Sequence, residues 1–260
     1  MQSLSKFVAV AGAASRRKAA ELIRAGRVRV NGEVVASPGA PVDESADRVE
    51  LDGRALVVEP RVYMLLNKPR GPISAARDQR GRQTVLDLLG VKDARLYPAG
   101  RLDADTEGLL IITNDGELTL RLTHPRFGVE KVYEAEVEGR PTQDALDRLQ
   151  KGVLLDDGPS GPARVRLLHA GETASRVELT IHAGRKRQVR RMLQAIGHPV
   201  VSLIRTRVGP LTLGDLKPGQ WRRLTQAEVG QLRSAAEKGA ASRTGGGDSR
   251  QREPAQRDRR

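Results

Sequence analysis

The feature that most constrains the fold of this chain is a short, unbroken aliphatic run at residues 109–112, which follows a polar segment. A run of this length without polar alternation predicts a buried strand. The polar segment, residues 100–108, holds three carboxylates and an arginine, and we expect it to form a loop. Residues 114–116 predict a tight turn at the far end of the strand, because glycine accepts positive φ. Reactive side chains often lie on such braced loops, so the segment is a candidate active site.

Composition narrows the partners and reactions open to the chain. Its net charge of +13 and isoelectric point near 10.7 predict a polyanionic partner, most often nucleic acid. Aromatic residues make up only 2%, which disfavours extensive base stacking. The absence of cysteine excludes disulfides, thiolate zinc sites and a cysteine nucleophile, and the four histidines lack the spacing of metal ligands. No apolar run reaches the roughly 18 residues of a membrane span, so we expect a cytoplasmic protein.

The first 59 residues predict a small separate unit of two helices and a hairpin. Apolar residues have helical spacing over residues 16–25, and Ser15 is placed to cap that helix. The pair Asn31-Gly32 lies between two short β-type segments, which is the strongest sequence signal for a hairpin turn. The unit therefore predicts a compact α/β module.

Basic side chains are concentrated at the start of this unit. Residues 1–32 hold seven basic residues and one acidic residue, whereas residues 33–60 hold seven acidic and two basic residues. A solvated helix normally mixes both signs, so the separation favours a face for RNA phosphates over an ordinary charged surface. The cations expected to contact RNA are Arg16, Arg17, Lys18, Arg24 and Arg27.

The same unit carries a recognisable pattern. The letters L-x-K-F-x-x-x-A-G-x-x-S-R-R, followed by I-x-x-G-x-V-x-V-N-G, resemble the RNA-binding module named after ribosomal small-subunit protein four. The resemblance covers residues 3 to about 50. It implies that two helices and a hairpin grip structured RNA.

Residues 60–236 predict a second domain, and residues 237–260 predict a disordered basic tail. From Gly239 onward the chain has no aliphatic residue larger than alanine, so it cannot form a core. Within the domain we expect a helix at 85–89 capped by Thr84, strands at 200–203 and 206–208, and a last helix at 226–236.

A basic segment lies late in the second domain. Five of the seven residues 185–191 are basic, and apolar residues from Val189 onward have helical spacing. We expect Arg187, Arg190 and Arg191 on the early part of a helix, whose N-terminal end favours anions.

Three ordered motifs of the second domain resemble those of the pseudouridine synthases: G-R-L-D-x-x-T-x-G-L-L, K-x-Y and G-R-x-R-Q-V-R-R-M. The preceding module and the letters N-K-P-x-G are similar to the RsuA/RluB branch, which modifies ribosomal RNA. Residues 152–159 and 201–209 favour the members that act on the large subunit. The resemblance implies an α+β fold, with a small α/β RNA-binding module before a catalytic domain that has a mixed, mostly antiparallel central sheet. It implies site-specific isomerisation of uridine to pseudouridine in ribosomal RNA, with no cofactor and no metal.

The resemblance also assigns roles to three residues. Asp103 corresponds to the catalytic carboxylate, Tyr133 to the residue that stacks on the base and takes part in proton transfer, and Arg190 to the ion-pair partner of Asp103. A carboxylate can stabilise positive charge at the sugar, trap it covalently or accept a proton, and an arginine keeps it ionised. Further contacts to RNA are expected from Lys68, Arg70, Arg101, Lys131, Arg185, Arg187 and Arg191.

Each assignment has a plainer alternative. Asp103 could cap a turn, and Tyr133 could be ordinary strand core. Asp105 and Glu107 offer the second carboxylate of a glycosidase, but the family leaves these positions variable, which favours solvated surface. The rival functions are a non-catalytic RNA-binding protein of ribosome assembly and an RNA glycosidase. We expect a monomer whose partner is ribosomal RNA of the large subunit, either free or in an assembly intermediate.

Overall fold

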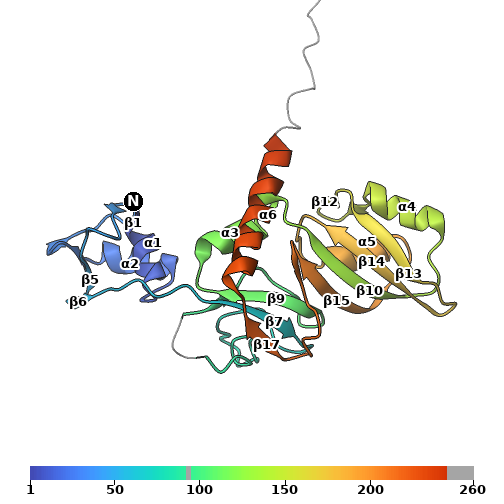
Figure 1. Cartoon of the computed structure of the whole chain (residues 1–260), viewed down its shortest axis with the longest axis horizontal. Coiled ribbons are helices and arrows are strands. Elements are labelled where there is room, and N and C mark those ends of the chain that lie inside the picture. The colour runs from blue at the N-terminus through green and yellow to red at the C-terminus, as the bar shows by residue number, and fades with distance from the viewer. Residues whose placement is uncertain (92–94, 245–260) are drawn as a thin grey trace, which may run out of the picture.

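The computed structural model describes residues 1–91 and 95–244 of the chain. Figure 1 shows a small N-terminal module at one end of the molecule and a large sheet flanked by helices at the other. In the part of the chain that is described, no helix is both long and apolar enough to cross a membrane.

The N-terminal module has the predicted helices and hairpin. Ser15 caps the second helix, since its Oγ accepts a hydrogen bond from the backbone N–H of Lys18 at 3.1 Å. Asn31 and Gly32 have φ of 52° and 88°, the values that a two-residue hairpin turn requires. The elements are β1 (Gln2–Ser3), α1 (Leu4–Val10), α2 (Arg16–Arg24), β2 (Val28–Val30), β3 (Glu33–Val34), β4 (Pro41–Val42), β5 (Val49–Leu51) and β6 (Arg54–Ala55).

A nine-stranded mixed sheet forms the second domain, with the main order β13-β14-β10-β15-β9-β7-β17. Strands β9 and β15 run parallel, and the other strand pairs described in this sheet are antiparallel, so the predicted sheet type is confirmed. Its strands are β7 (Tyr63–Lys68), β8 (Tyr97–Pro98), β9 (Glu107–Thr113), β10 (Lys131–Glu138), β13 (Arg164–His169), β14 (Ala174–Ile181), β15 (Val200–Val208), β16 (Leu211–Thr212) and β17 (Trp221–Arg223).

The sheet is buried on both faces around β7 and β9. Alternate residues of β9 enter two different hydrophobic cores. Leu110 and Ile112 belong to the first core, and Leu109 and Ile111 belong to the second. Helices α4 (Gln143–Lys151) and α5 (Gln188–Ala195) complete the first core, and α3 (Gly116–Thr123) and α6 (Gln226–Thr244) complete the second. The aliphatic run at 109–112 is therefore a fully buried central strand, as its lack of polar alternation indicated.

Gly108 allows the one parallel strand pairing of the sheet. It has φ of 103°, and a Cβ on it would lie 2.3 Å from the backbone oxygen of Arg205. Residues larger than glycine would therefore force β9 and β15 apart at the point where the polar loop begins.

Two sequence predictions around these strands were wrong. Residues 114–116 do not form the predicted tight turn with a glycine at positive φ, because Asp115 is the N-cap of α3 and accepts hydrogen bonds from the backbone N–H groups of Glu117 and Leu118. Residues 85–89 form a turn instead of a helix. Thr84 and Asp87 exchange the hydrogen bonds of a helix cap, but they close a single turn that does not continue.

Two predicted boundaries also changed. Residues 200–203 and 206–208 belong to one continuous strand, β15, whose middle pairs with the start of β9. The predicted disordered tail was to begin at residue 237, but α6 continues to Thr244. A Cβ at Gly239 would lie 2.0 Å from the oxygen of Phe127, so this part of α6 packs closely on η1 (Pro125–Phe127). The rest of the predicted tail, residues 245–260, lies outside the described residues.

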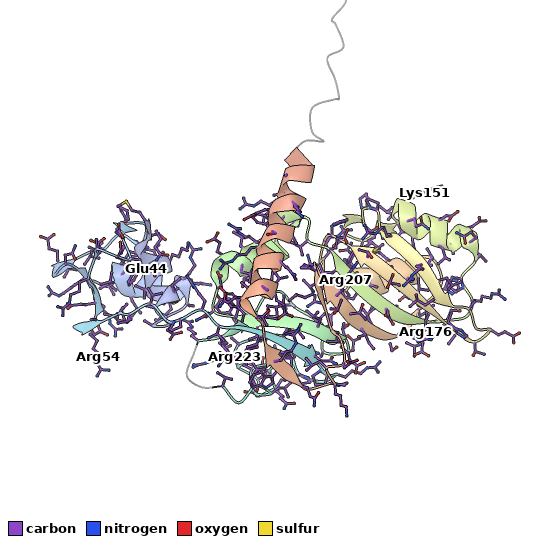
Figure 2. The ribbon with its side chains drawn as sticks, in the orientation of Figure 1. Glu44, Arg54, Lys151, Arg176, Arg207 and Arg223 are labelled. Carbon is purple, nitrogen blue, oxygen red and sulfur yellow. The ribbon has the colours of Figure 1, made fainter. Side chains whose placement is uncertain are left out.

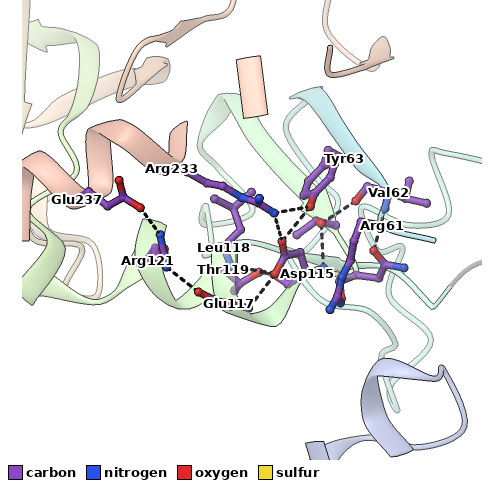
Figure 3. Close-up of polar contacts among 12 residues, drawn as sticks. Arg61, Val62, Tyr63, Asp115, Glu117, Leu118, Thr119, Arg121, Arg233 and Glu237 are labelled. Atoms are coloured by element: carbon purple, nitrogen blue, oxygen red, sulfur yellow. Dashed lines mark hydrogen bonds and ion pairs between the residues drawn. The ribbon is translucent and has the colours of Figure 1, made fainter. Parts of the chain in front are cut away.

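A buried carboxylate joins three elements on the α3–α6 side of the sheet (Figure 3). Asp115, only 4% exposed, accepts hydrogen bonds from the hydroxyl of Tyr63 at 2.9 Å and from Arg233 of α6 at 3.2 Å. Burial by itself raises the pKa of Asp115, but the hydrogen bonds from Leu118 and Tyr63 and the nearby arginines outweigh it, so the pKa is lowered. Asp115 thus ties β7, α3 and α6 together.

Replacing Asp115 by alanine removes the cap of α3 and leaves the buried Tyr63 hydroxyl without its acceptor. We expect the free energy of unfolding to fall by about 2–4 kcal/mol, which urea denaturation measures. The native carboxylate stabilises the fold above the ordinary carboxyl pKa of about 4, and that contribution is lost as the pH falls toward the lowered folded value. As the pH falls from about 5 to about 3, the free energy of unfolding of the alanine variant should therefore fall less than that of the native protein.

The matched control is Glu237→Gln, which breaks an exposed ion pair with Arg121 in the same network. Because exposed pairs contribute little, its effect should stay below about 1 kcal/mol. Equal losses in the two variants would contradict the central role of Asp115.

Candidate active site

The polar loop before β9 borders a cavity of about 590 Å³. Asp103 lies in its wall together with Tyr133 of β10, Arg205 of β15 and the basic segment that begins α5. Three motifs that are far apart in the sequence therefore meet at one cavity. Arg101, which is exposed, and Arg187 lie in the same wall.

A buried lysine holds the loop from the side of β7. The Nζ of Lys68 donates hydrogen bonds to the backbone oxygens of Pro69 at 3.0 Å, Thr106 at 3.0 Å and Ala104 at 3.4 Å. Lys68 is fully buried, so the prediction that it contacts RNA was wrong. Burial lowers its pKa to about 8, against the partly opposing charges of Asp105, Glu107 and Asp103. The prediction failed because Lys68 is the last residue of a strand, where a basic side chain is often exposed, whereas here it points into the fold.

The segment after β7 adds further bonds to the same loop. The hydroxyl of Ser74 donates to the oxygen of Leu102 at 2.8 Å and accepts from its N–H at 3.0 Å. The N–H of Gly71 donates to the oxygen of Ala104 at 2.9 Å. The backbone on both sides of Asp103 is thus fixed, while its side chain, 39% exposed, remains at the cavity.

The start of α5 holds the loop from the opposite side, through Asp105. Both nitrogens of Arg187 donate to the Asp105 carboxylate, at 3.1 and 3.0 Å. Nη2 of Arg190 donates to the backbone oxygen of Asp105 at 2.8 Å and lies 3.4 Å from its carboxylate. Asp105 is exposed, as we predicted, but it also pairs with two arginines of the α5 segment.

This geometry changes the expected ion pair of Asp103. The predicted partner, Arg190, pairs with Asp105 in the structure, and the cation recorded beside Asp103 is Arg187, whose Nη1 lies 3.9 Å from the carboxylate. Glu107, the third carboxylate, pairs with the exposed Arg70 at 3.3 Å. Since Asp105 is neutralised by two arginines, it is not a free second carboxylate of the kind a glycosidase uses.

Tyr133 is 8% exposed and lies against an arginine that the sequence reasoning missed. The guanidinium carbon of Arg205 is 5.9 Å from the centre of the Tyr133 ring, and its Nη1 lies 3.4 Å from the tyrosine hydroxyl. Arg205 is 5% exposed and donates from Nε to the oxygen of Leu109 at 2.8 Å. Strand alternation could have found it, because Arg205 shares a strand face with the buried Leu203.

Several predicted RNA contacts have structural partners instead. Lys131 is 8% exposed and its Nζ donates to the oxygens of Val129 and His182, so it supports the cavity wall. Arg185 donates to three backbone oxygens of residues 157–159, and Arg191 binds the Asp157 carboxylate through both nitrogens. Lys131, Arg185 and Arg191 therefore shape the site, and their predicted contacts to RNA stay a prediction.

The predicted basic face of the N-terminal module lies on exposed residues. Arg16, Arg17 and Lys18 begin α2 on its exposed side, and Arg24 ends it. Arg27 donates to the Asp52 carboxylate, with its Nε at 2.9 Å. Among residues 1–91 and 95–244, no group of three or more histidine and carboxylate side chains is placed to hold a metal ion.

Replacing Lys68 by methionine tests its part in holding the loop. Three backbone oxygens lose the Lys68 donor, and the bond to Thr106 among them is buried, so we expect the free energy of unfolding at pH 7 to fall by about 2–4 kcal/mol. In the native protein the folded state releases the Lys68 proton near pH 8, whereas the unfolded chain holds it until about 10.5. The native protein should therefore gain stability relative to the variant as the pH rises from about 8 to about 10.

Urea unfolding at several pH values measures both effects, and Lys151→Met, an exposed lysine on α4, is the control. A native protein and a Lys68→Met variant with parallel stability curves above pH 8 would show that the buried amine does not titrate as inferred.

Comparison with known proteins identifies the two parts of the chain. Residues 62–195 match the family model described as RNA pseudouridylate synthase, and residues 2–49 match the S4 domain. The matched ranges agree with the sheet domain and the N-terminal module.

Individual relatives extend over nearly the whole chain. The Bacillus subtilis protein named ribosomal large subunit pseudouridine synthase B is 47% identical over 92% of this chain and 98% of its own length. An RNA pseudouridine synthase of Mycobacterium tuberculosis H37Rv is 44% identical over 89% of this chain and 93% of its own length. A crystal structure of a pseudouridylate synthase superposes with a TM-score of 0.65 at 32% identity, covering 89% of this chain and all of that chain. The chain therefore belongs to the RNA pseudouridylate synthase family, enzymes that convert uridine in RNA to pseudouridine, and it carries an N-terminal S4 domain.

Proposed function

We propose that this enzyme converts a specific uridine of large-subunit ribosomal RNA to pseudouridine, with Asp103 as the catalytic carboxylate. The observation that carries the proposal is the placement of Asp103: a loop bonded to the fold through Leu102, Ala104 and Thr106 presents its carboxylate to the cavity. A reacting group held in this way loses little freedom when substrate binds.

The reaction makes definite demands on this site. The bond between N1 of uracil and C1′ of the ribose breaks, the base turns, and a bond from C5 to C1′ replaces it. The proton on C5 must leave, and N1 gains one. A carboxylate beside C1′ can stabilise or trap the sugar and can accept a proton, so one residue serves each step. Asp103 is the carboxylate of the loop that borders the cavity without a bidentate partner in the structure.

Tyr133 and Arg205 supply the environment of the base in this proposal. An aromatic ring in the cavity wall offers a flipped uracil a stacking surface. Arg205 fixes the tyrosine from the side, because its guanidinium lies near both the ring and the hydroxyl. The tyrosine hydroxyl is also the group that would exchange a proton with the base.

The substrate class follows from the relatives and from the charge of the chain. The name of the Bacillus subtilis relative refers to the ribosomal large subunit, and its sequence covers this chain almost completely. The S4 domain and the net charge of +13 support binding to folded RNA. Arg101 and Arg187 line the cavity, Arg70 pairs with Glu107 of the polar loop, and these three arginines are the proposed contacts to the RNA backbone there. The monomeric state and the cytoplasmic location remain predictions.

Asp103→Asn should reduce pseudouridine formation by about a thousandfold or more, because the amide can neither trap the sugar nor accept a proton. The measurement is pseudouridine content in ribosomal RNA transcripts incubated with purified protein, with free uracil followed by chromatography. Affinity for the same RNA should change little, since the residue carries one charge among many.

Glu107→Gln is the matched control, because it removes a neighbouring carboxylate and should leave turnover near the native value. Turnover that survives Asp103→Asn would refute the assignment. Release of free uracil by the native protein would instead identify an RNA glycosidase.

Changing Arg16, Arg17 and Lys18 together to alanine should weaken RNA binding. Three phosphate contacts fewer should also lower the slope of log K against log salt by about 2–3 units. The matched control changes Arg164, Arg166 and Arg176 of β13 and β14 to alanine, which removes the same total charge. Arg176 lies at the far end of the molecule from the N-terminal module (Figure 2). A slope that drops equally in both triple variants would rule out α2 as a specific RNA face.

A further inference from the structure

Two arginines of the α5 segment, Arg187 and Arg190, face two carboxylates of the polar loop, Asp103 and Asp105. The arginines contact Asp105 more closely than Asp103. Asp105 receives both nitrogens of Arg187 and lies 3.4 Å from Nη2 of Arg190. Asp103 lies 3.9 Å from Nη1 of Arg187, beyond hydrogen-bond distance. The residue beside the chemistry is therefore less tightly paired than its neighbour.

The backbone of Arg187 indicates that this arrangement is imposed by its surroundings. Arg187 is the N-cap of α5 and has φ of 50°, a left-handed conformation that is unfavourable for a residue other than glycine. Such a conformation persists where neighbouring contacts determine it. The hydrogen bonds recorded for its side chain go to Asp105, which lies 82 residues earlier in the chain.

Arg190 depends on the same carboxylate. Its side chain is 11% exposed, and it donates to the backbone oxygens of Asp105 and Val200. Its Nε is buried and has no hydrogen-bond partner among the described residues. Asp105 thus provides the negative charge closest to a largely buried guanidinium.

We propose that Asp105 is a positioning residue of the pseudouridine synthase reaction, which keeps Arg187 and Arg190 close to Asp103 but off its oxygens. This inference rests on the proposed role of Asp103. An arginine bound through both nitrogens would cover the carboxylate oxygens that must reach the sugar. A cation about 4 Å away favours the charged carboxylate and leaves those oxygens free.

Other charged groups surround this arrangement and contribute to its titration. They come from the segment after β7, from the loop itself and from α5: Lys68, Arg70, Asp103, Glu107, Arg187 and Arg190. Burial raises the pKa of Asp105, but the hydrogen bonds and charges of Arg187 and Arg190 outweigh it and lower the pKa overall. Asp105 is therefore ionised at neutral pH and holds both arginines there.

Asp105→Asn tests the proposal with a change of one atom. The amide holds the arginines weakly, so they should turn to Asp103, and kcat at neutral pH should fall about tenfold, with a smaller change in KM. Because both cations then face Asp103, the acid limb of the kcat–pH profile should move to lower pH by about one unit. Asp105→Glu, which keeps the charge, should recover part of kcat and restore the acid limb.

Arg187→Gln makes a second, independent test through the opposite partner. It removes the cation recorded beside Asp103, so the acid limb should move to higher pH, opposite to the shift in Asp105→Asn. Partial misfolding would lower the amount of active enzyme without moving the acid limb. Because Arg187 is exposed, its replacement should leave the fold intact, and the proposal stays testable even if Asp105→Asn does not fold.

Glu107→Gln is the control in the same loop, because its carboxylate pairs with Arg70 and with neither arginine of the α5 segment, so its acid limb should move much less than that of Asp105→Asn. A native profile in Asp105→Asn, or shifts of the same sign in Asp105→Asn and Arg187→Gln, would overturn the inference. A native enzyme that forms no pseudouridine in ribosomal RNA would instead overturn the proposed function, and this inference with it.

Discussion

The bonds from Lys68 to the loop of Asp103 are the interaction on which the site depends. Buried backbone oxygens require donors, and an irregular loop beside a buried strand has few of its own. The amine of Lys68 donates to three backbone oxygens, two of them in the loop, and lies at the end of β7, which is buried on both faces. The loop of Asp103 is therefore attached to a buried strand at the centre of the sheet. The charge that a lysine brings into the fold is offset by the three carboxylates of the same loop.

The sheet topology explains why this loop can be reached from α5. Strands β9 and β15 meet in parallel at Gly108 and Arg205, where no side chain fits between their backbones. This close approach brings Arg205 under the ring of Tyr133 and brings the chain that follows α5 beside the loop. One contact without a side chain thus allows Asp103, Tyr133, Arg187 and Arg205 to gather around one cavity.

Much of the fold could be predicted because its local signals were strong. The cap at Ser15, the Asn31-Gly32 turn and the aliphatic run of β9 each act over a few residues, and all three formed as expected. The two errors have different causes. Asp115 was expected in a tight turn, but local bonds to the N–H groups of Glu117 and Leu118 make it the cap of α3. Lys68 was expected to contact RNA, but distant partners, the backbone oxygens of the polar loop, hold it inside the fold.

The sequence by itself determined the family, the position of the candidate carboxylate at Asp103 and the two modules, because these depend on motifs and on short-range periodicity. Only the tertiary structure decided which arginine meets which carboxylate. Arg187 and Arg190 are adjacent on one segment, and Asp103 and Asp105 on another, so residue types and spacing allow every pairing. The actual pairing follows from the left-handed backbone at Arg187 and the direction in which α5 leaves it, and these are set by packing across the sheet.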